Sequence, residues 1–183
     1  VKGMRITGYQ GTISQGAYLL TVGTGNFVQS TGTITGGSMR MTFQGDYTLS
    51  GGTFTVTSDS LFVEGGTFSR TGGTFTQNTT NLYVTSGNVT FNMGAYTLKR
   101  VVFNTAGNIT VTGTLIIDDS LVLTSANGMI GGTITVAKDL INRCTSMPGT
   151  KTTILTLNGT INQNLRQAAG AVWPGTYLEV NKT

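Results

Sequence analysis

A four-residue pattern of glycine, a small polar residue, an apolar residue and then usually Thr or Ser recurs along most of the chain. One series of these units begins at glycines about 20 residues apart, namely Gly11, Gly32, Gly52, Gly73, Gly94, Gly113 and Gly132. A second series begins in another phase, at Gly25, Gly45, Gly66, Gly87 and Gly107. A third, more apolar stretch lies between them, at 18–22, 39–43, 61–63, 82–84, 101–103, 121–123 and 140–141. Each period therefore predicts three short strands.

A period of about 20 residues with three strands and glycine corners predicts an all-β chain, folded as a three-sided parallel β-solenoid. Glycine adopts the positive φ that lets the chain turn between sides. Residues one period apart then lie above one another, about 4.8 Å apart, in roughly seven or more coils. Parallel connections favour right-handed winding. We expect regular coils over 1–140, and irregular coils or a cap with insertions over 141–183 of the same domain.

Side-chain alternation along each strand predicts which residues face the interior. The first inward column is Ile13, Ile34, Phe54, Phe75, Tyr96, Leu115 and Ile134, and the second is Phe27, Tyr47, Phe68, Val89 and Ile109. The third side has two inward columns, Leu20, Met41, Leu61, Leu82, Val101, Leu121 and Leu140 beside Val22, Phe43, Val63, Val84, Phe103 and Leu123. Every column is apolar over its whole length, as the core of a solenoid requires.

The outward position between these last two columns becomes apolar from the third coil onward. We call its members the apolar stripe: Phe62, Tyr83, Val102, Val122 and Ile141. Soluble monomers rarely expose a continuous apolar patch of this kind. Two interpretations stay open: residues 165–180 fold over the stripe, or another molecule covers it by lateral association.

A second outward feature is a double rank of Thr on the first side. The threonine ladder consists of Thr33, Thr35, Thr53, Thr55, Thr74, Thr76, Thr133 and Thr135. Its regular hydroxyl and methyl groups resemble the ice-binding faces of Thr-x-Thr β-solenoid antifreeze proteins, and the resemblance implies ice binding by this face alone. The alternative is structural, because Thr is a good strand former and stacked Thr residues stabilise a sheet locally.

Composition limits the chemistry further. The chain has 11 Lys and Arg against 7 Asp and Glu, for a net charge of +4, and it has no His. The cations are scattered, so the sequence predicts no nucleic-acid partner. Cys144 is the only Cys and the chain has no His, so the usual ligand set of a zinc site is absent. We therefore expect neither a metal nor a cofactor. No apolar run approaches the ~20 residues of a membrane span.

Carboxylates are the usual catalytic groups of enzymes that act on polysaccharides. Asp119 and Asp139 are 20 residues apart and would stack on adjacent coils. At the same spacing Lys99 falls on their column, and Lys138 falls on that of Asp118. The sequence therefore predicts a solvated ladder of alternating charge and a protein that is not an enzyme. A carbohydrate-binding or carbohydrate-active β-helix stays an alternative.

Over about residues 10–140, the glycine-cornered coils resemble the repetitive β-solenoid segments of large bacterial surface proteins, including adhesins and autotransporter-type passengers. The resemblance implies a secreted, extracellular or cell-surface module with a structural or adhesive role. It also implies self-association, or packing against neighbouring coils of the same surface protein, in a surface layer or filament. Val1 is not an initiator Met, so we expect a mature chain or an excised piece. An ice surface or a glycan is the alternative partner.

Overall fold

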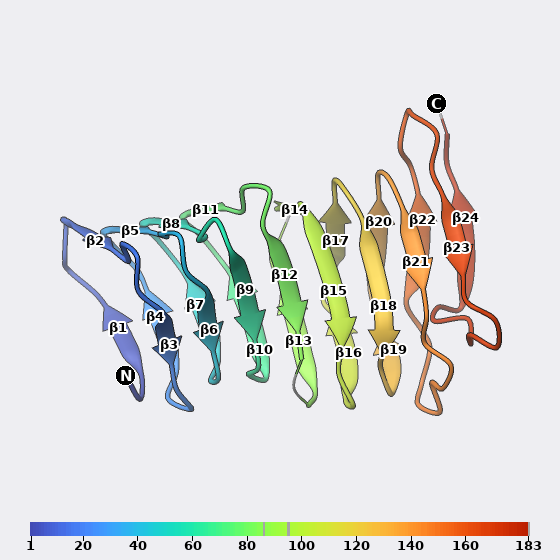
Figure 1. The fold of residues 1–183 in the computed structure, drawn as a ribbon, viewed down its shortest axis with the longest axis horizontal. Coiled ribbons are helices and arrows are strands. Elements are labelled where there is room, and N and C mark those ends of the chain that lie inside the picture. Colours follow the sequence, from blue (N-terminus) through green and yellow to red (C-terminus); the bar gives the residue numbers. More distant parts are fainter. Residues whose placement is uncertain (86, 95, 183) are drawn as a thin grey trace.

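The structure is a computed structural model that describes residues 1–85, 87–94 and 96–182. Thr183, the last residue of the predicted C-terminal segment, lies outside them. The described residues form strands and no helix, stacked in parallel into a β-solenoid of about 8 turns with roughly 21 residues per turn. Figure 1 shows the coils following one another from the N-terminal to the C-terminal end of a rod. The predicted fold class is confirmed.

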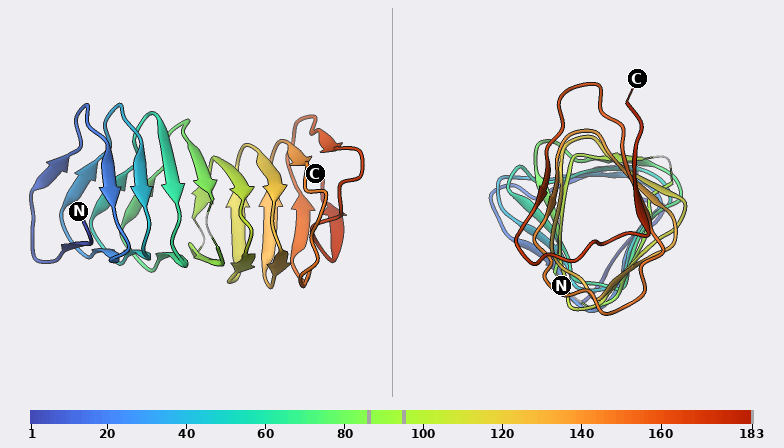
Figure 2. Two further views of the ribbon diagram at one scale, coloured as in Figure 1. Left: turned by 60° about the horizontal axis from the view of Figure 1, so that its bottom comes forward. Right: turned by 90° about the vertical axis from the view of Figure 1, so that its right-hand side faces the viewer.

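Four parallel sheets make up the sides of the rod, whose section is a rounded triangle in the right-hand view of Figure 2. The seven-stranded sheet contains β1 (Met4–Ile6), β4 (Phe27–Gln29), β7 (Tyr47–Leu49), β10 (Thr67–Arg70), β13 (Val89–Asn92), β16 (Asn108–Val111) and β19 (Gly128–Ile130). The eight-stranded sheet contains β3 (Leu20–Val22), β6 (Met41–Phe43), β9 (Ser60–Val63), β12 (Asn81–Val84), β15 (Arg100–Asn104), β18 (Leu121–Ser125), β21 (Leu140–Asn142) and β23 (Leu165–Gln167).

The remaining side is divided between two sheets. The four-stranded sheet contains β2 (Thr12–Ser14), β5 (Thr33–Thr35), β8 (Thr53–Thr55) and β11 (Thr74–Thr76). The five-stranded sheet contains β14 (Thr97–Leu98), β17 (Thr114–Ile117), β20 (Thr133–Val136), β22 (Ile154–Leu157) and β24 (Tyr177–Val180). The division falls between β11 and β14, which belong to different sheets although they occupy consecutive coils. We call this division the step.

Glycine corners turn the chain between sides, as the sequence predicts. Gly52 and Gly73 have φ of 74° and 66°, in the left-handed region that side chains with a Cβ avoid. Space is a second constraint, because a Cβ on Gly52 would lie 2.4 Å from the carbonyl oxygen of Gly32 in the preceding coil. These glycines therefore allow both the turn and the close stacking of one corner on the next.

The interior is a continuous column of aromatic and aliphatic side chains. Phe27 stacks on Tyr47 with ring centroids 4.9 Å apart, and Tyr47 stacks on Phe68 at 4.7 Å. In the adjacent column Phe54 stacks on Phe75 at 5.7 Å and meets the Tyr47 ring edge-on. All of these rings are buried. Burial of such large apolar groups is the main favourable contribution to folding.

The second predicted column is wrong in one place. Phe68 pairs with Phe91 and not with Val89, because the coil from β10 to β13 is two residues longer than the preceding coil from β7 to β10. An insertion of two residues preserves the inward and outward alternation of a strand. Val89 therefore still faces the core and pairs with Ile109 as expected, while Phe91 joins the aromatic stack.

The C-terminal segment extends the rod. β23 pairs with β21 and β24 pairs with β22, each in parallel at the end of its sheet. The interpretation that residues 165–180 fold over the apolar stripe is therefore wrong, since Arg166 follows Ile141 in register instead of covering it. Trp173 is partly buried against the core, and Figure 2 shows the C-terminal chain crossing part of the section at that end.

Replacing Phe54 with Ala tests the aromatic stack. We expect the free energy of unfolding to fall by about 3–5 kcal/mol, because the ring is fully buried and leaves a cavity between rigid coils. Urea unfolding followed by circular dichroism measures the change. Thr55→Ala, at the adjacent outward position, is the control and should change stability by no more than about 0.5 kcal/mol. Equal effects of the two substitutions would contradict the inward placement of Phe54.

Candidate functional site

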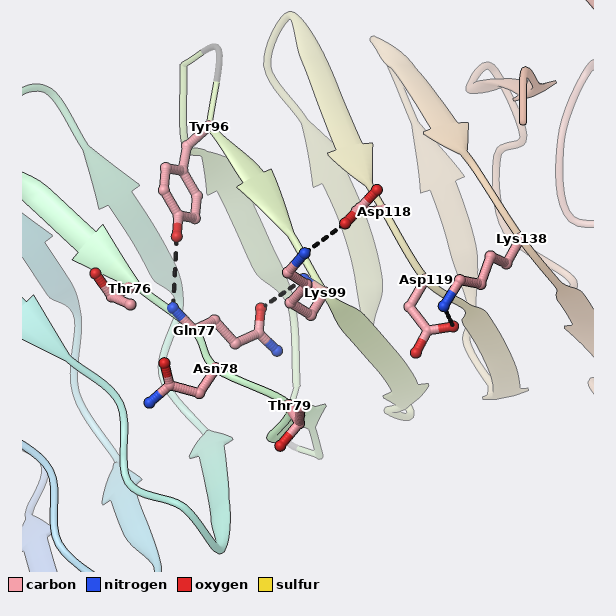
Figure 3. Close-up of a pocket in the computed structure, with 9 residues that line it drawn as sticks. All are labelled: Thr76, Gln77, Asn78, Thr79, Tyr96, Lys99, Asp118, Asp119 and Lys138. Atoms are coloured by element: carbon pink, nitrogen blue, oxygen red, sulfur yellow. Dashed lines mark hydrogen bonds and ion pairs between the residues drawn. The ribbon is translucent and has the colours of Figure 1, made fainter. Parts of the chain in front are cut away.

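A groove of about 580 Å³ lies at the step (Figure 3). Its lining residues are Thr76, Gln77, Asn78, Thr79, Tyr96, Lys99, Asp118, Asp119 and Lys138. The first four come from the end of β11 and the residues after it, and the others come from the coils beyond the step. The groove therefore exists because the strands of consecutive coils, β11 and β14, do not pair at the step.

The buried Gln77 side chain bridges the step. Its Nε2 donates to the carbonyl oxygens of Thr80, at 2.8 Å, and Arg100, at 3.2 Å. Its Oε1 accepts from the backbone N–H of Lys99 at 2.9 Å. The side-chain amide thus supplies hydrogen bonds between coils where the backbone strands do not pair.

Sequence reasoning missed this residue, although a signal was present. Gln15 also directly follows a strand of the same side, and its Oε1 accepts from the N–H of Gly37 at 2.8 Å. Its Nε2 donates to the carbonyl oxygens of Tyr18 and Met39, each at 2.7 Å. A glutamine directly after the Thr-x-Ser or Thr-x-Thr strand is therefore the signature of a corner stabilised by a side-chain amide.

Tyr96 forms the wall of the groove opposite Gln77. Its ring packs edge-on against Phe75 at 5.4 Å, and the Arg70 guanidinium carbon lies 5.3 Å from the ring centroid. Its hydroxyl oxygen accepts a long hydrogen bond from the backbone N–H of Gln77, at 3.4 Å. The predicted inward column therefore reaches Tyr96, but this ring is only partly buried.

Two ion pairs cross the coils beyond the step. Lys99 is paired with Asp118, and Lys138 Nζ lies 3.4 Å from Asp119 Oδ1. The predicted stacking of Lys99, Asp119 and Asp139 is wrong, because Leu98, Ile117 and Val136 are in register at a step of 19 residues. Positive and negative side chains still alternate from coil to coil, but Lys99 pairs with Asp118 and Lys138 pairs with Asp119.

Asp139 lies outside both pairs. Its Oδ1 accepts from the backbone N–H and from the side-chain amide of Asn164, at 3.0 and 2.9 Å.

These hydrogen bonds change the acidity of the groups involved. The hydrogen bond from Lys99 lowers the pKa of Asp118, and the same contact raises the pKa of Lys99. The backbone N–H of Asn164 is the main cause that lowers the pKa of Asp139. Asp118 and Asp139 are therefore ionised at neutral pH. A lowered pKa suits a polar binding surface, whereas a general acid needs a raised one.

The apolar stripe forms one row on the outer face of the eight-stranded sheet. Its members pair in register from β9 to β21. Phe62 stacks on Tyr83 with centroids 4.9 Å apart, and the Arg40 guanidinium carbon lies 5.1 Å from the Phe62 ring centroid. The row is less exposed than we expected, because stacked neighbours cover one another: Val122 is 4% exposed and the other four members are half-buried.

The threonine ladder is in register over three coils and then stops. Thr33, Thr53 and Thr74 form one rank, and Thr35, Thr55 and Thr76 form the other. Thr133 and Thr135 lie in the five-stranded sheet, beyond the step. There Thr135 pairs with Ile116, which interrupts the second rank. The expectation of one continuous ladder is therefore wrong.

Exposed apolar side chains occur elsewhere, at the two ends of the rod. Within the described residues, the large apolar side chains that are exposed are Val1, Tyr9, Tyr18, Leu19, Met39, Ile161, Leu165, Tyr177 and Val180. All of them belong to the first two coils or to the last one. Sequence reasoning did not select them as a group.

Neither a metal site nor a membrane helix occurs in the part of the chain that the structure describes. It contains no group of three or more Cys, Asp and Glu side chains placed to hold a metal ion. It likewise contains no helix long and apolar enough to cross a bilayer. Comparisons of the chain with protein-family models, with curated proteins and with solved structures found no match. The function must therefore be argued from the surfaces described above.

Replacing Gln77 with Ala tests the bridge across the step. We expect stability to fall by about 1–3 kcal/mol, because backbone groups of three residues lose their partner. We also expect faster hydrogen exchange at the Lys99 amide, measured by NMR. Asn78→Ala removes an exposed neighbouring amide and should change neither quantity. A Lys99 amide that stays equally protected in the Gln77 variant would contradict the bridge.

Replacing Lys99 with Gln tests the ion pair at the groove. We expect the pKa of Asp118 to rise toward its ordinary value, because the hydrogen bond from Lys99 that stabilises the ionised carboxylate is lost. An NMR titration of the side-chain carboxyl carbon measures the pKa of Asp118. Lys138→Gln should give a smaller rise of the Asp118 pKa, since Lys138 acts on Asp118 through charge attraction alone, without a hydrogen bond.

The same shift sets the sign of the effect on stability. Because the pKa of Asp118 is lowered on folding, the pair stabilises the protein above the ordinary carboxyl pKa and loses this effect as the pH falls through the folded-state pKa. Both groups are half-exposed, so the contribution is small. An unchanged Asp118 titration in the Lys99 variant would contradict the pairing.

Proposed function

We propose that this chain is a structural or adhesive module without enzymatic activity. It acts outside the cell or at the cell surface, as a stiff rod that presents its faces to neighbouring molecules. Lateral association through the apolar stripe joins it to other rods, or to coils of the same surface protein. The observation that carries the proposal is the aromatic pair Phe62 and Tyr83, stacked on an outer face that no segment of the described residues covers.

Stiffness follows from the way the coils bond to one another. Each strand pairs in parallel with its counterpart in the next coil, so bending the rod would strain sheets on several sides at once. The continuous aromatic core adds contacts between consecutive coils. A solenoid is stabilised by its nearest-neighbour interfaces, and its length presents an extended surface for binding.

The apolar stripe has the composition of an interface centre. Aromatic side chains and Arg are enriched at such centres, and here Phe62 and Tyr83 lie beside Arg40. Because the row is half-buried within the free rod, its rings are already held in place, which lowers the entropy cost of binding. Polar residues occupy the outward positions on both sides of the row, for example Asn81 and Glu64. Such a polar rim around an apolar centre is typical of protein interfaces.

The two alternative partners are supported less well. Ice binding by the threonine ladder stays a prediction, and the step ends the regular part of the ladder after β11. Glycan binding also stays a prediction, with the groove at the step as its place because Tyr96 lies there among amide, hydroxyl and charged groups. Both features are local, whereas the apolar stripe runs through five coils.

Replacing Phe62 or Tyr83 with Asp tests the lateral contact. We expect the wild-type chain to form side-by-side assemblies in electron micrographs as its concentration rises, and each variant to lose them, because a carboxylate cannot be buried in the contact without a partner. The control is Thr110→Asp, which places the same charge at a half-buried outward position of the seven-stranded sheet. Side-by-side assembly that persists equally in all three variants would overturn the proposal.

A further inference from the structure

The groove at the step lies where the corners of the coil change in length. Four residues, 77–80, connect β11 to β12, whereas Lys99 alone connects β14 to β15. The two corners therefore differ in shape and do not stack closely, and the groove lies between them. Its volume of about 580 Å³ falls within the range of about 300–1,000 Å³ that is typical of sites for small ligands.

The lining of the groove continues along the rod. Asp118 and Asp119 lie between β17 and β18, and Lys138 lies between β20 and β21, so the corners of two further coils take part. Figure 3 shows these side chains on successive coils. Consecutive coils are about 4.8 Å apart, which is close to the length of one sugar unit in an extended glycan. A ligand that repeats at this spacing meets polar groups in each coil.

Charge limits the ligand to a neutral molecule. Lys99 pairs with Asp118 and Lys138 pairs with Asp119, so the four charged groups of the lining cancel. Binding of a phosphate group needs a cation that is free, and binding of a metal ion needs free carboxylates. Each half-exposed pair instead places N–H donors beside carboxylate acceptors. Neighbouring sugar hydroxyl groups match this combination, because each hydroxyl both donates and accepts.

Uncharged polar side chains on the opposite wall are available to the same ligand. The side chains of Asn78 and Thr79 are exposed and form no hydrogen bond with any residue that the structure describes. Gln77 differs, because its amide is already bonded on both sides of the step. The free amide and hydroxyl together offer donors and acceptors without charge. They suit a ligand that is rich in hydroxyl groups.

Tyr96 adds an aromatic surface that is held in place before a ligand binds. Its ring packs edge-on against Phe75 at 5.4 Å, and the Arg70 guanidinium carbon lies 5.3 Å from the ring centroid. The ring lines the groove and is only partly buried. The apolar C–H face of a sugar packs well on an aromatic ring, and a ring that is already fixed lowers the entropy cost of binding.

We infer that the groove at the step binds a neutral, unbranched oligosaccharide that lies along the rod. Tyr96 packs against one sugar ring, and Asn78 and Thr79 form hydrogen bonds with its hydroxyl groups. The two ion pairs bind hydroxyl groups of the following sugar units. The site gives the rod a glycan as a second partner. It shares no residue with the apolar stripe and does not depend on lateral association.

NMR titration of the full chain with neutral tetrasaccharides of glucose, of xylose and of N-acetylglucosamine tests the inference. We expect at least one of them to shift the backbone amide signals of Asn78, Thr79 and Lys99, with a dissociation constant in the millimolar range or below. Tetragalacturonate has the same length but a carboxylate on each unit. It should bind at least about tenfold more weakly, because both lysines of the groove are already neutralised.

Substitutions separate the sugar contacts from the fold. Asn78→Ala should weaken binding about three- to tenfold, because one hydrogen-bonding group is lost. Tyr96→Ala should abolish measurable binding, whereas Tyr96→Phe keeps the ring and should bind nearly as well as the wild-type chain. Asn104→Ala removes an amide that is also exposed, on the eight-stranded sheet, and is the matched control. Circular dichroism checks that Tyr96→Ala is folded, and the exposed position of Asn78 keeps the test independent of that variant.

Asp118→Asn tests whether the ion pairs set the preference for a neutral ligand. The substitution leaves Lys99 without its partner carboxylate. We therefore expect tetragalacturonate to gain at least about tenfold in affinity, while the neutral tetrasaccharide binds more weakly. Lys99→Gln should weaken binding of the neutral chain without producing this gain.

Three results overturn the inference. The first is a groove whose amide signals shift with none of the neutral tetrasaccharides, and the second is a wild-type chain that prefers tetragalacturonate. The third is binding that is equally strong in Asn78→Ala, Tyr96→Ala and the Asn104→Ala control. Phe62→Asp should leave glycan binding unchanged, so failure of the lateral contact and failure of glycan binding give different results.

Discussion

Parallel pairing between strands one turn apart is the constraint on which the rest of this structure depends. It places residues about 21 positions apart in direct contact, so each position of the repeat becomes a row that runs along the rod. A row that faces inward is apolar in most coils, as at Phe27, Tyr47 and Phe68. Where a polar residue enters such a row, as at Gln29 and Asn142, it is buried and its side-chain amide donates hydrogen bonds. A corner must leave room for the corner above it, which is why Gly32 and Gly52 stack without side chains. Fold, core and surface pattern thus follow from one geometric rule.

The features that could carry function occur where this rule changes. The turn from β10 to β13 has two additional residues, and the next coils of the divided side repeat at 19. In this region β11 and β14 do not pair with each other, and the groove lies between their two coils. The Gln77 amide replaces the missing backbone hydrogen bonds, and the altered register pairs Lys99 with Asp118. The irregular repeat is tolerated because side chains form hydrogen bonds with the backbone N–H and C=O groups that have no partner in the next coil.

Neighbouring coils also decide which apolar groups are available for binding. Within a row each side chain is covered by the one above and the one below, so even the outward Val122 is almost buried. In the first and last coils of the described residues, side chains of the same kind, such as Leu165, are exposed. The apolar stripe therefore provides a narrow, preorganised lateral surface.

The sequence by itself determined the parallel solenoid, most members of the inward columns and the glycine corners, because a local repeat of apolar, polar and glycine positions encodes all three. It also determined the apolar stripe, since alternation alone assigns Phe62 and Tyr83 to the outer face. Only the tertiary structure decided the pairing of Phe68 with Phe91, the partners of Lys99 and Lys138, the break in the threonine ladder and the bridge made by Gln77. The physical reason is that insertions of one or two residues are absorbed at corners. Their effect on register appears only once the coils are stacked.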